Sequence, residues 1–243
     1  MSSMETERCV SFCRLFISYS GAKVLKSINW TVCAGDRWHL KGANGSGKTT
    51  LCSMITGDHP QSYTQSHLHL FGRPRKNIAT VQLQRKIGIS SPEIFAAFPR
   101  RLGPGALTAR DAIATGFDGT YAYRKRAEQE EERLDEIIGA LGSGKNKEAK
   151  IKWAEGVFAT LSPGEQSLVL FMRALVASPR LVILDEAFAG MDDATIIRCS
   201  EHLRLRLGAH QAVVMVSHWE DEIPWRGDNL RRYLIEDGVG SEI

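Results

Sequence analysis

The chain has 243 residues, of which 43% are hydrophobic and 24% charged, as is usual for a globular protein with a buried core. Its formal net charge of +3 is too small to indicate a nucleic-acid partner or a membrane-surface role. There is no run of eighteen apolar residues, and the N-terminus carries acidic residues instead of an apolar signal segment. We therefore expect a cytoplasmic chain that does not insert into a membrane.

The five cysteines are scattered, at positions 9, 13, 33, 52 and 199. Cys9 and Cys13 are four residues apart, but no second Cys or His pair at metal-ligand spacing accompanies them. The set predicts reduced thiols in a cytosolic protein, without a metal site.

The first ninety residues predict β-strands around one helix. Segments rich in β-branched and aromatic residues are separated by turn residues, and one amphipathic segment ends at Gly57. Strands are expected at 14–20, 24–32, 67–72 and 86–91, with a further strand that runs from a turn at 34–36 to Gly42, and the helix at 49–57.

From about residue 92 to residue 161 the apolar periodicity is helical, most clearly at 108–117 and 123–142. The charged run at 124–133 is interpreted as a solvated helix face instead of an interaction patch. Alternation of helix and strand then resumes, at 164–178, 180–186, 192–207 and 211–218. The pattern predicts a parallel-sheet α/β core interrupted by a small helical insertion.

The stretch KGANGSGKTT at 41–50 fits the pattern G-x-x-x-x-G-K-[ST] between a predicted strand and a predicted helix. Glycines let backbone N–H groups turn toward a phosphate, and the helix that follows directs its positive end at the same anion. Lys48 would bridge the β- and γ-phosphates and Thr49 would bind Mg²⁺. This context disfavours a fortuitous glycine-rich turn. The predicted nucleotide-binding residues of this loop are Gly42, Asn44, Gly45, Ser46, Gly47, Lys48, Thr49 and Thr50.

LVILDE at 181–186 predicts a buried strand that ends in two carboxylates. Ligands bind at the carboxyl ends of strands in open α/β sheets. Asp185 would hold Mg²⁺, directly or through water, and Glu186 would orient or deprotonate the attacking water.

LSPGEQ at 161–166 stands at the start of an apolar helix. Here the chain resembles the ATP-binding cassette (ABC) family, whose signature reads L-S-G-G-[QE]. The resemblance implies that Ser162, Gly164 and Glu165 contact the γ-phosphate of ATP held by the opposite subunit. Pro163 replaces the first signature glycine, which a helix entry tolerates. On its own, the segment also reads as a well-capped helix.

Two further matches follow in the order that the family requires. AGMD at 189–192 resembles the D-loop, and His218, after a predicted strand, resembles the switch histidine that contacts the γ-phosphate. Upstream, Tyr19 resembles the aromatic residue that stacks on adenine, with Phe16 as a competitor, and Val24 would flank the base.

The resemblance covers about residues 14–235 and implies one ABC ATP-binding domain over 1–243. This is a P-loop NTPase with a RecA-like parallel-sheet core and an N-terminal antiparallel β subdomain. We expect core and β subdomain at 14–92 and 165–235, and an inserted α-helical subdomain at about 93–164.

More narrowly, the stretch TGDHPQ after the P-loop helix is similar to ModF-type cassettes and their fungal relatives, which usually hold two cassettes in one chain.

One feature departs from the family. Pro92 stands where most cassettes have a glutamine that touches Mg²⁺ and transmits motion to a transmembrane domain. Proline has no side-chain ligand, so Ser91 or a water would complete the Mg²⁺ shell.

The resemblance implies an ATPase that clamps Mg-ATP between two cassettes, as a homodimer or with a second ABC cassette. The missing glutamine favours a role without direct coupling to a transmembrane domain. The alternative is the ATP-binding subunit of a transporter with a separate permease chain, for molybdate or another small anion by analogy. A third class, a nucleotide switch that barely hydrolyses, is disfavoured by Glu186 and His218.

Overall fold

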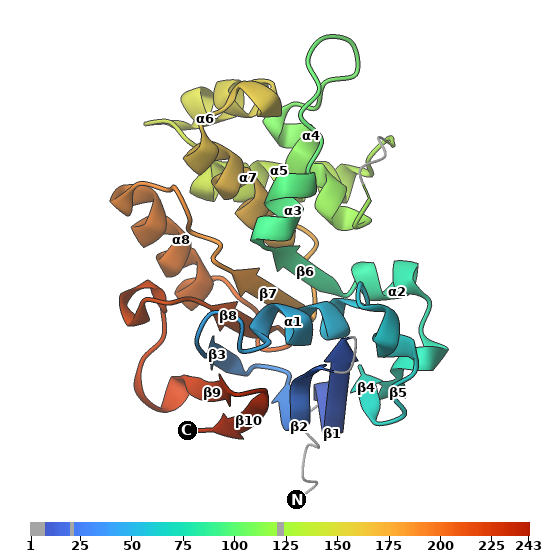
Figure 1. The fold of residues 1–243 in the computed structure, drawn as a ribbon. Coiled ribbons are helices and arrows are strands. Elements are labelled where there is room, and N and C mark those ends of the chain that lie inside the picture. The colour runs from blue at the N-terminus through green and yellow to red at the C-terminus, as the bar shows by residue number, and fades with distance from the viewer. Residues whose placement is uncertain (1–7, 20–21, 121–123) are drawn as a thin grey trace, which may run out of the picture.

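The computed structural model describes the backbone of residues 8–19, 22–120 and 124–243, and their side chains except at 12–16, 18–19 and 22–23. Its described strands form one sheet of six strands and one of four, with helices packed against them (Figure 1). This arrangement confirms the predicted α/β class with a parallel core and an N-terminal antiparallel sheet.

The six-stranded sheet has the order β10-β9-β3-β8-β7-β6, and its strands are parallel except for β10. Alternate residues of the fully buried strand β7 face two different cores. Leu181 and Ile183 pack with α1, whereas Val182 and Leu184 pack with α7 and α8. The strands are β3 (Arg37–Lys41), β6 (Ile87–Ser90), β7 (Leu181–Asp185), β8 (Ala212–Val216), β9 (Arg231–Glu236) and β10 (Val239–Glu242).

The antiparallel sheet has the order β2-β1-β4-β5. Its strands are β1 (Arg8–Tyr19), β2 (Ala22–Cys33), β4 (Leu68–Leu70) and β5 (Arg73–Pro74). Three buried aromatic rings join this sheet to the parallel one: Trp30 stacks on Tyr233 at 4.8 Å and meets Trp38 edge-on at 5.3 Å. The first strand begins at Arg8, earlier than residue 14 as predicted.

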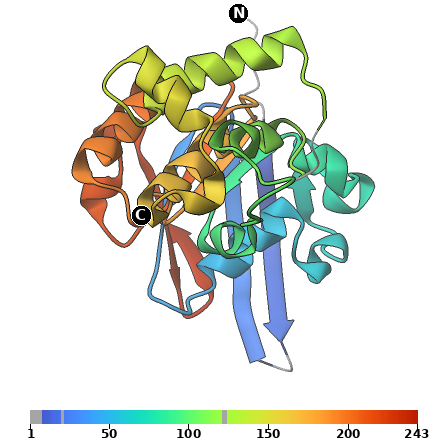
Figure 2. The ribbon, with the colours of Figure 1, turned by 90° about the horizontal axis from the view of Figure 1, so that it is seen from above.

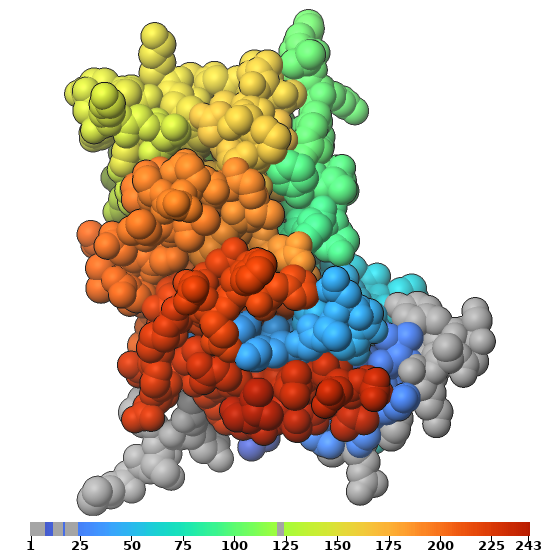
Figure 3. Space-filling view, turned by 60° about the vertical axis from the view of Figure 1, so that its left-hand side comes forward, coloured from blue at the N-terminus to red at the C-terminus, as the bar shows by residue number. Residues whose placement is uncertain are grey.

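The C-terminal hairpin formed by β9 and β10 was not predicted. Its turn places Asp237 and Gly238 at φ values of 48° and 77°. The Gly238 carbonyl accepts a hydrogen bond from the Lys26 amide of β2. This bond holds the β9–β10 hairpin next to β2, beside the start of the P-loop. Figure 3 shows the red hairpin beside the light-blue segment that contains this loop.

The helices α3–α7 gather on one side of the two sheets, above them in Figure 1 and toward the viewer in Figure 2. The α-helices are α1 (Lys48–Thr56), α2 (Thr80–Gln84), α3 (Pro92–Ala97), α4 (Ala109–Ala114), α5 (Glu128–Leu141), α6 (Lys147–Ala154), α7 (Pro163–Leu175) and α8 (Asp193–Leu205). Short 3-10 helices occupy Pro60–Tyr63, Arg75–Asn77, Thr115–Phe117, Phe158–Thr160, Glu220–Glu222 and Gly227–Asn229. Among the described residues, each helix is too short or too polar to cross a lipid bilayer.

Helix α5 begins at Glu128, although the sequence pattern predicts a start near residue 123. The Glu130 carboxylate accepts a hydrogen bond from the Ala127 amide at 3.0 Å, which caps the helix there. It also pairs with the Arg124 guanidinium upstream of the helix. The charged run therefore starts in extended chain.

The contact between β6 and α7 depends on Gly88. A Cβ at Gly88 would lie 1.8 Å from the Ala174 carbonyl oxygen of α7, so only glycine fits without moving the helix. We expect Gly88→Ala to lower the free energy of unfolding by about 3 kcal/mol, since a packed interface resists added volume. Urea unfolding would measure this. The control is Gly139→Ala in α5, where the added Cβ meets nothing within 4 Å and should stabilise the helix by roughly 1 kcal/mol. Equal effects of the two substitutions would contradict the prediction.

Candidate active site

The sheet topology brings four chemistry-bearing segments to one edge. Strands β3, β8, β7 and β6 are parallel neighbours, so their carboxyl ends lie side by side. In that order they lead into the P-loop, His218, the Asp185–Glu186 pair, and Ser91. Segments separated by more than 170 residues therefore form one site at the edge where α/β sheets bind ligands.

The P-loop backbone requires glycine at two positions. Gly42 has φ 151°, and a Cβ there would lie 2.4 Å from the Ile235 carbonyl oxygen of β9. Gly47, the N-cap of α1, has φ 108°, and its Cβ would lie 2.5 Å from the Leu25 side chain. Because the loop is held this closely between β9 and β2, its amide groups are fixed at the start of α1.

Polar groups of the loop suit a phosphate. Lys48 Nζ donates hydrogen bonds to the Gly42 and Ala43 carbonyls at 2.7 and 3.0 Å, which places the ammonium over the loop. The Ser46 hydroxyl is buried and has no hydrogen-bond partner among the described residues. Gly45 has φ 78°, and Asn44 beside it is exposed at the tip. An unpaired hydroxyl and a cation beside one loop are groups that an anion would satisfy.

The two threonines after Lys48 have different surroundings. Thr49 is exposed and borders a cavity of about 260 Å³ together with Asp185. Thr50 is half-buried, and its carbonyl accepts a hydrogen bond from the Ser53 hydroxyl at 2.8 Å. Of the two threonines, Thr49 is the one that borders a cavity together with Asp185, the predicted Mg²⁺ ligand.

Asp185, the last residue of β7, is 7% exposed. Its pKa is raised to about 6, chiefly by burial and then by the charges of Glu93 and Glu186, although Lys48 and His218 act to lower it. A buried carboxylate among other carboxylates lacks compensation, so a bound cation would stabilise its ionised form.

Glu186 and His218 face each other at the same edge. His218 Nε2 lies 3.4 Å from Glu186 Oε1, and both side chains are roughly half exposed. Glu186 has φ 47°, an uncommon conformation for a residue with a side chain, and its amide donates to the Val216 carbonyl of β8. Backbone strain of this kind is retained where the surrounding structure holds a functional side chain in place.

The signature segment forms the start of α7. Ser162 is the N-cap, and its hydroxyl accepts from the Glu165 amide at 3.3 Å. The Glu165 carboxylate accepts from the Ser162 amide and hydroxyl at 3.0 and 2.8 Å and from Trp153 Nε1 at 2.9 Å. Glu165 thus holds Ser162 in position, and the contact of these residues with a partner's nucleotide stays a prediction.

The start of α7 also touches the D-loop directly. A Cβ at Gly164 would lie 2.2 Å from the Gly190 carbonyl oxygen, so the two backbones are in contact. Ser162 itself is exposed and borders neither of the two cavities, of about 260 and 340 Å³, that Asp185 borders. The structure therefore groups the P-loop, Asp185, Glu186 and His218. Ser162 lines neither cavity, although its neighbour Pro163 lines the larger one together with Asp185 and Glu186.

The predicted adenine-binding residues are placed only in part. Val24 is half-buried, and its carbonyl lies beside Gly47 of the P-loop and Gly238 of the hairpin turn. The side chains of Tyr19 and Phe16 lie outside the described residues, so their stacking on adenine stays a prediction.

Two supports of the site were missed by sequence reasoning. The Ile235 carbonyl of the C-terminal hairpin abuts Gly42, and the Asp237-Gly238 dipeptide between apolar residues was the available signal for that hairpin. Arg100 donates to the Gln166 side chain at 3.1 Å and so links the segment after α3 to the signature helix. No local pattern predicts this second contact.

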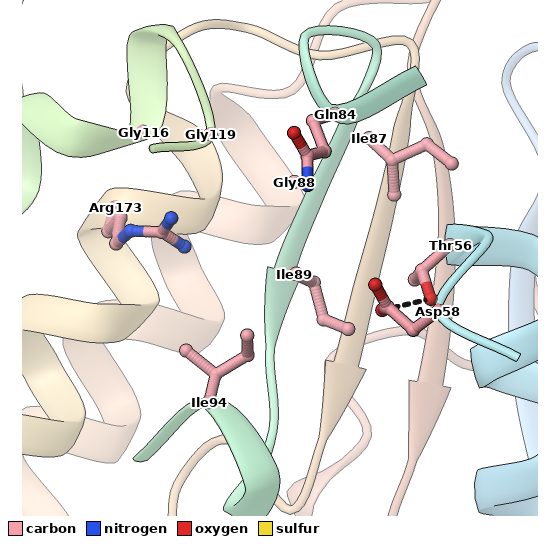
Figure 4. A pocket seen from close by; sticks show the side chains of 10 residues that line it. All are labelled: Thr56, Asp58, Gln84, Ile87, Gly88, Ile89, Ile94, Gly116, Gly119 and Arg173. Carbon is pink, nitrogen blue, oxygen red and sulfur yellow. Dashed lines mark hydrogen bonds between the residues drawn. The ribbon is translucent and has the colours of Figure 1, made fainter. Parts of the chain in front are cut away.

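A cavity of about 190 Å³ separates the P-loop helix from the helical side (Figure 4). Arg173 of α7 points toward it from one wall, while Asp58 accepts a hydrogen bond from Thr56 at the opposite wall. It shares Thr56, Asp58, Ile89 and Ile94 with the cavity that Thr49 and Asp185 border. The cavity beside Thr49 and Asp185 therefore adjoins the cavity between the P-loop helix and the helical side.

Comparison with known proteins finds relatives over most of this chain. The family model described as ABC transporter matches residues 25–189. An ABC transporter ATP-binding protein of Schizosaccharomyces pombe is 38% identical over 91% of this chain, and one of Saccharomyces cerevisiae is 36% identical over 92%. The ABC transporter ATP-binding protein ModF of Escherichia coli is 34% identical over 84% of the chain. The matches span 42%, 41% and 40% of these relatives, so this chain covers about two fifths of their length.

Solved structures show the same fold. An ATP-binding subunit of an ABC transporter superposes with a TM-score of 0.74 at 18% identity, over 97% of this chain and 90% of that one. A bacterial Atm1-family ABC exporter with ATP bound gives a TM-score of 0.71 at 18% identity, over 98% of this chain and 38% of that one. At this identity the likeness concerns the fold alone. The matched family model and the relatives above 30% identity show that the chain belongs to the ABC family of ATP-binding cassettes, whose members are ATPases.

Proposed function

We propose that this chain binds Mg-ATP with its P-loop and hydrolyses it only when Ser162 of a second cassette completes the site. One observation carries the proposal: Lys48, Asp185, Glu186 and His218 meet at one edge, while Ser162, the exposed N-cap of α7, borders neither cavity that Asp185 borders. The second cassette is another copy of this chain or a sister cassette.

The residues present fit a nucleotide and a divalent cation. The buried Ser46 hydroxyl lacks a partner among the described residues, and the buried Asp185 carboxylate lies with Thr49 at one cavity. Mg²⁺, when bound, would neutralise charge on the phosphates as the terminal bond breaks. Thr49 and Asp185 would hold it.

The chain's own groups would carry the remaining chemistry. Lys48 would neutralise the β- and γ-phosphate oxygens, and the loop amides would fix their position. Glu186 would accept a hydrogen bond from the attacking water and orient it. His218, 3.4 Å from Glu186, would hold that carboxylate and contact the γ-phosphate. ATP would favour the closed pair, and hydrolysis would release it.

We further propose a cytoplasmic role without direct coupling to a transmembrane domain, because Pro92 supplies no polar side-chain group in place of the glutamine. Residues 93–164 would act as the helical signature subdomain. The alternative is a transporter subunit, favoured by the names of the relatives, with an anion such as molybdate by analogy with ModF. Co-purification of an integral membrane permease would support transport; its absence alongside a soluble assembly would support the first role.

Complementation between two inactive variants tests the composite site. Lys48→Ala removes the phosphate-binding cation and Ser162→Arg blocks the signature surface, so each alone should lose nearly all ATPase activity. A dimer of one Lys48→Ala chain and one Ser162→Arg chain retains one intact site of two. Since half of the dimers in a 1:1 mixture are of this kind, the mixture should recover about a quarter of the wild-type rate. The wild-type rate per chain should also rise with protein concentration. A flat rate and an inactive mixture would contradict the proposal for a homodimer.

A further inference from the structure

The segment after β6 differs chemically from what the ABC resemblance implies. Pro92 occupies the glutamine position and opens α3, so it offers no side-chain oxygen. The preceding Ser91 hydroxyl accepts a hydrogen bond from the Ile94 amide at 3.3 Å, which engages it as the cap of that short helix. The next polar group along the chain is Glu93.

Glu93 borders the same cavity of about 260 Å³ as Thr49 and Asp185, the two proposed Mg²⁺ ligands. Asp58 also borders this cavity, but it accepts a hydrogen bond from the Thr56 hydroxyl at 2.5 Å. Glu93 is exposed, and no hydrogen bond to its carboxylate from a described residue competes for this role. Among the groups around the cavity, Glu93 is thus the available carboxylate beside Asp185.

The charges at this point are unbalanced. The Asp185 side chain is more than nine-tenths buried, borders the cavity, and receives no hydrogen bond from any described residue. The Asp185 carboxylate borders one cavity with Glu93 and a second with Glu186, so three carboxylates lie around this point. A divalent cation at this position would relieve the repulsion.

The carboxylates do not form a metal site by themselves. Within the described part of the chain, no three acidic, histidine or cysteine side chains are arranged to hold an ion. Mg²⁺ commonly keeps several waters and binds proteins through one or two carboxylates together with substrate phosphates. A further carboxylate in such a site acts on a metal-bound water.

We propose that Glu93 takes the place of the missing glutamine by accepting a hydrogen bond from a water ligand of the Mg²⁺ that Thr49 and Asp185 hold. The inference rests on the proposed function, because it needs Mg-ATP at this site. Glu93 is therefore a positioning residue whose charge strengthens metal binding.

Metal affinity tests this role without reference to activity. Mn²⁺, in place of Mg²⁺, is titrated by electron paramagnetic resonance into the full chain with a non-hydrolysable ATP analogue. Glu93→Ala should weaken Mn²⁺ binding by roughly 10- to 100-fold, the usual cost of losing an outer-shell partner. Glu93→Gln keeps a side-chain oxygen but not the charge, so its affinity for Mn²⁺ should lie between the affinities of wild type and Glu93→Ala. The matched control is Glu128→Ala, which removes an exposed acid from the first turn of α5.

The outcomes separate the two proposals. Weaker Mn²⁺ binding in Glu93→Ala alone, with unchanged binding of the metal-free analogue in EDTA and an unchanged melting temperature, supports the role of Glu93. Equal Mn²⁺ affinities for wild type and Glu93→Ala overturn it and leave the proposed function standing. A wild type that binds no Mn²⁺ with the analogue overturns both. Equal losses in Glu93→Ala and Glu128→Ala overturn the role of Glu93, because a specific contact would not behave this way.

Discussion

Replacing Glu186 by Gln is expected to slow ATP hydrolysis by roughly 10²- to 10⁴-fold while ATP still binds. The amide keeps the size of the side chain and the position 3.4 Å from His218, but it no longer accepts a proton from water. The phosphate-binding groups of the P-loop and the Asp185 carboxylate are untouched. Single-turnover hydrolysis and equilibrium binding of ATP would separate the two effects.

Glu186→Gln should accumulate the ATP-bound dimer of cassettes, because the hydrolysis that would separate the dimer is blocked. Light scattering should show a monomer in ADP and a dimer in Mg-ATP for Glu186→Gln. A matched control is Glu201→Gln, an exposed acid on α8, which should behave as wild type. Hydrolysis within a few-fold of wild type in Glu186→Gln would remove Glu186 from its proposed role.

The parts of the site that were predictable from sequence are those coded by contiguous residues. The P-loop needs glycines and a lysine at fixed spacing, and Asp185 ends an apolar run that can only be a buried strand. The parallel sheet then places these segments at one edge without any further information. Local patterns were sufficient there because each functional group lies at the end of its own strand.

The parts that were not predictable depend on residues far apart in sequence. That Gly42 must be glycine follows partly from the Ile235 carbonyl, almost two hundred residues away. Glu165 matches a signature position, yet its carboxylate binds Trp153 and Ser162 because an indole N–H from α6 happens to face it. Side-chain partners of this kind follow from packing, which a single sequence does not specify.

Replacing Asp185 by Asn should have opposite effects on stability and on function. In the folded chain the Asp185 pKa is raised from 3.8 to about 6, chiefly by burial. The folded state therefore prefers the protonated acid, so stability is fully present below about pH 4 and is lost as the pH rises through about 6. A rise of this size corresponds to about 3 kcal/mol of lost stability above pH 6. Asparagine carries no charge and avoids this loss.

Without nucleotide and in EDTA, Asp185→Asn should exceed wild type in free energy of unfolding by about 3 kcal/mol at pH 7.5 and by less at pH 5. Urea unfolding at both values would measure the difference. A gap that does not change with pH would contradict the burial of an ionised Asp185.

Addition of Mg-ATP should narrow or reverse the difference in free energy of unfolding between Asp185→Asn and wild type. A ligand that binds only the folded chain stabilises it, and a tighter ligand stabilises it more. Wild type would gain this stabilisation through its carboxylate, whereas Asp185→Asn would gain little and hydrolyse little. On this proposal, the destabilising buried charge at the end of β7 is the charge that holds the cation. If Mg-ATP stabilised the two proteins equally, Asp185 would not be a metal ligand, and the carboxylate role would have to move to Glu93 or Glu186.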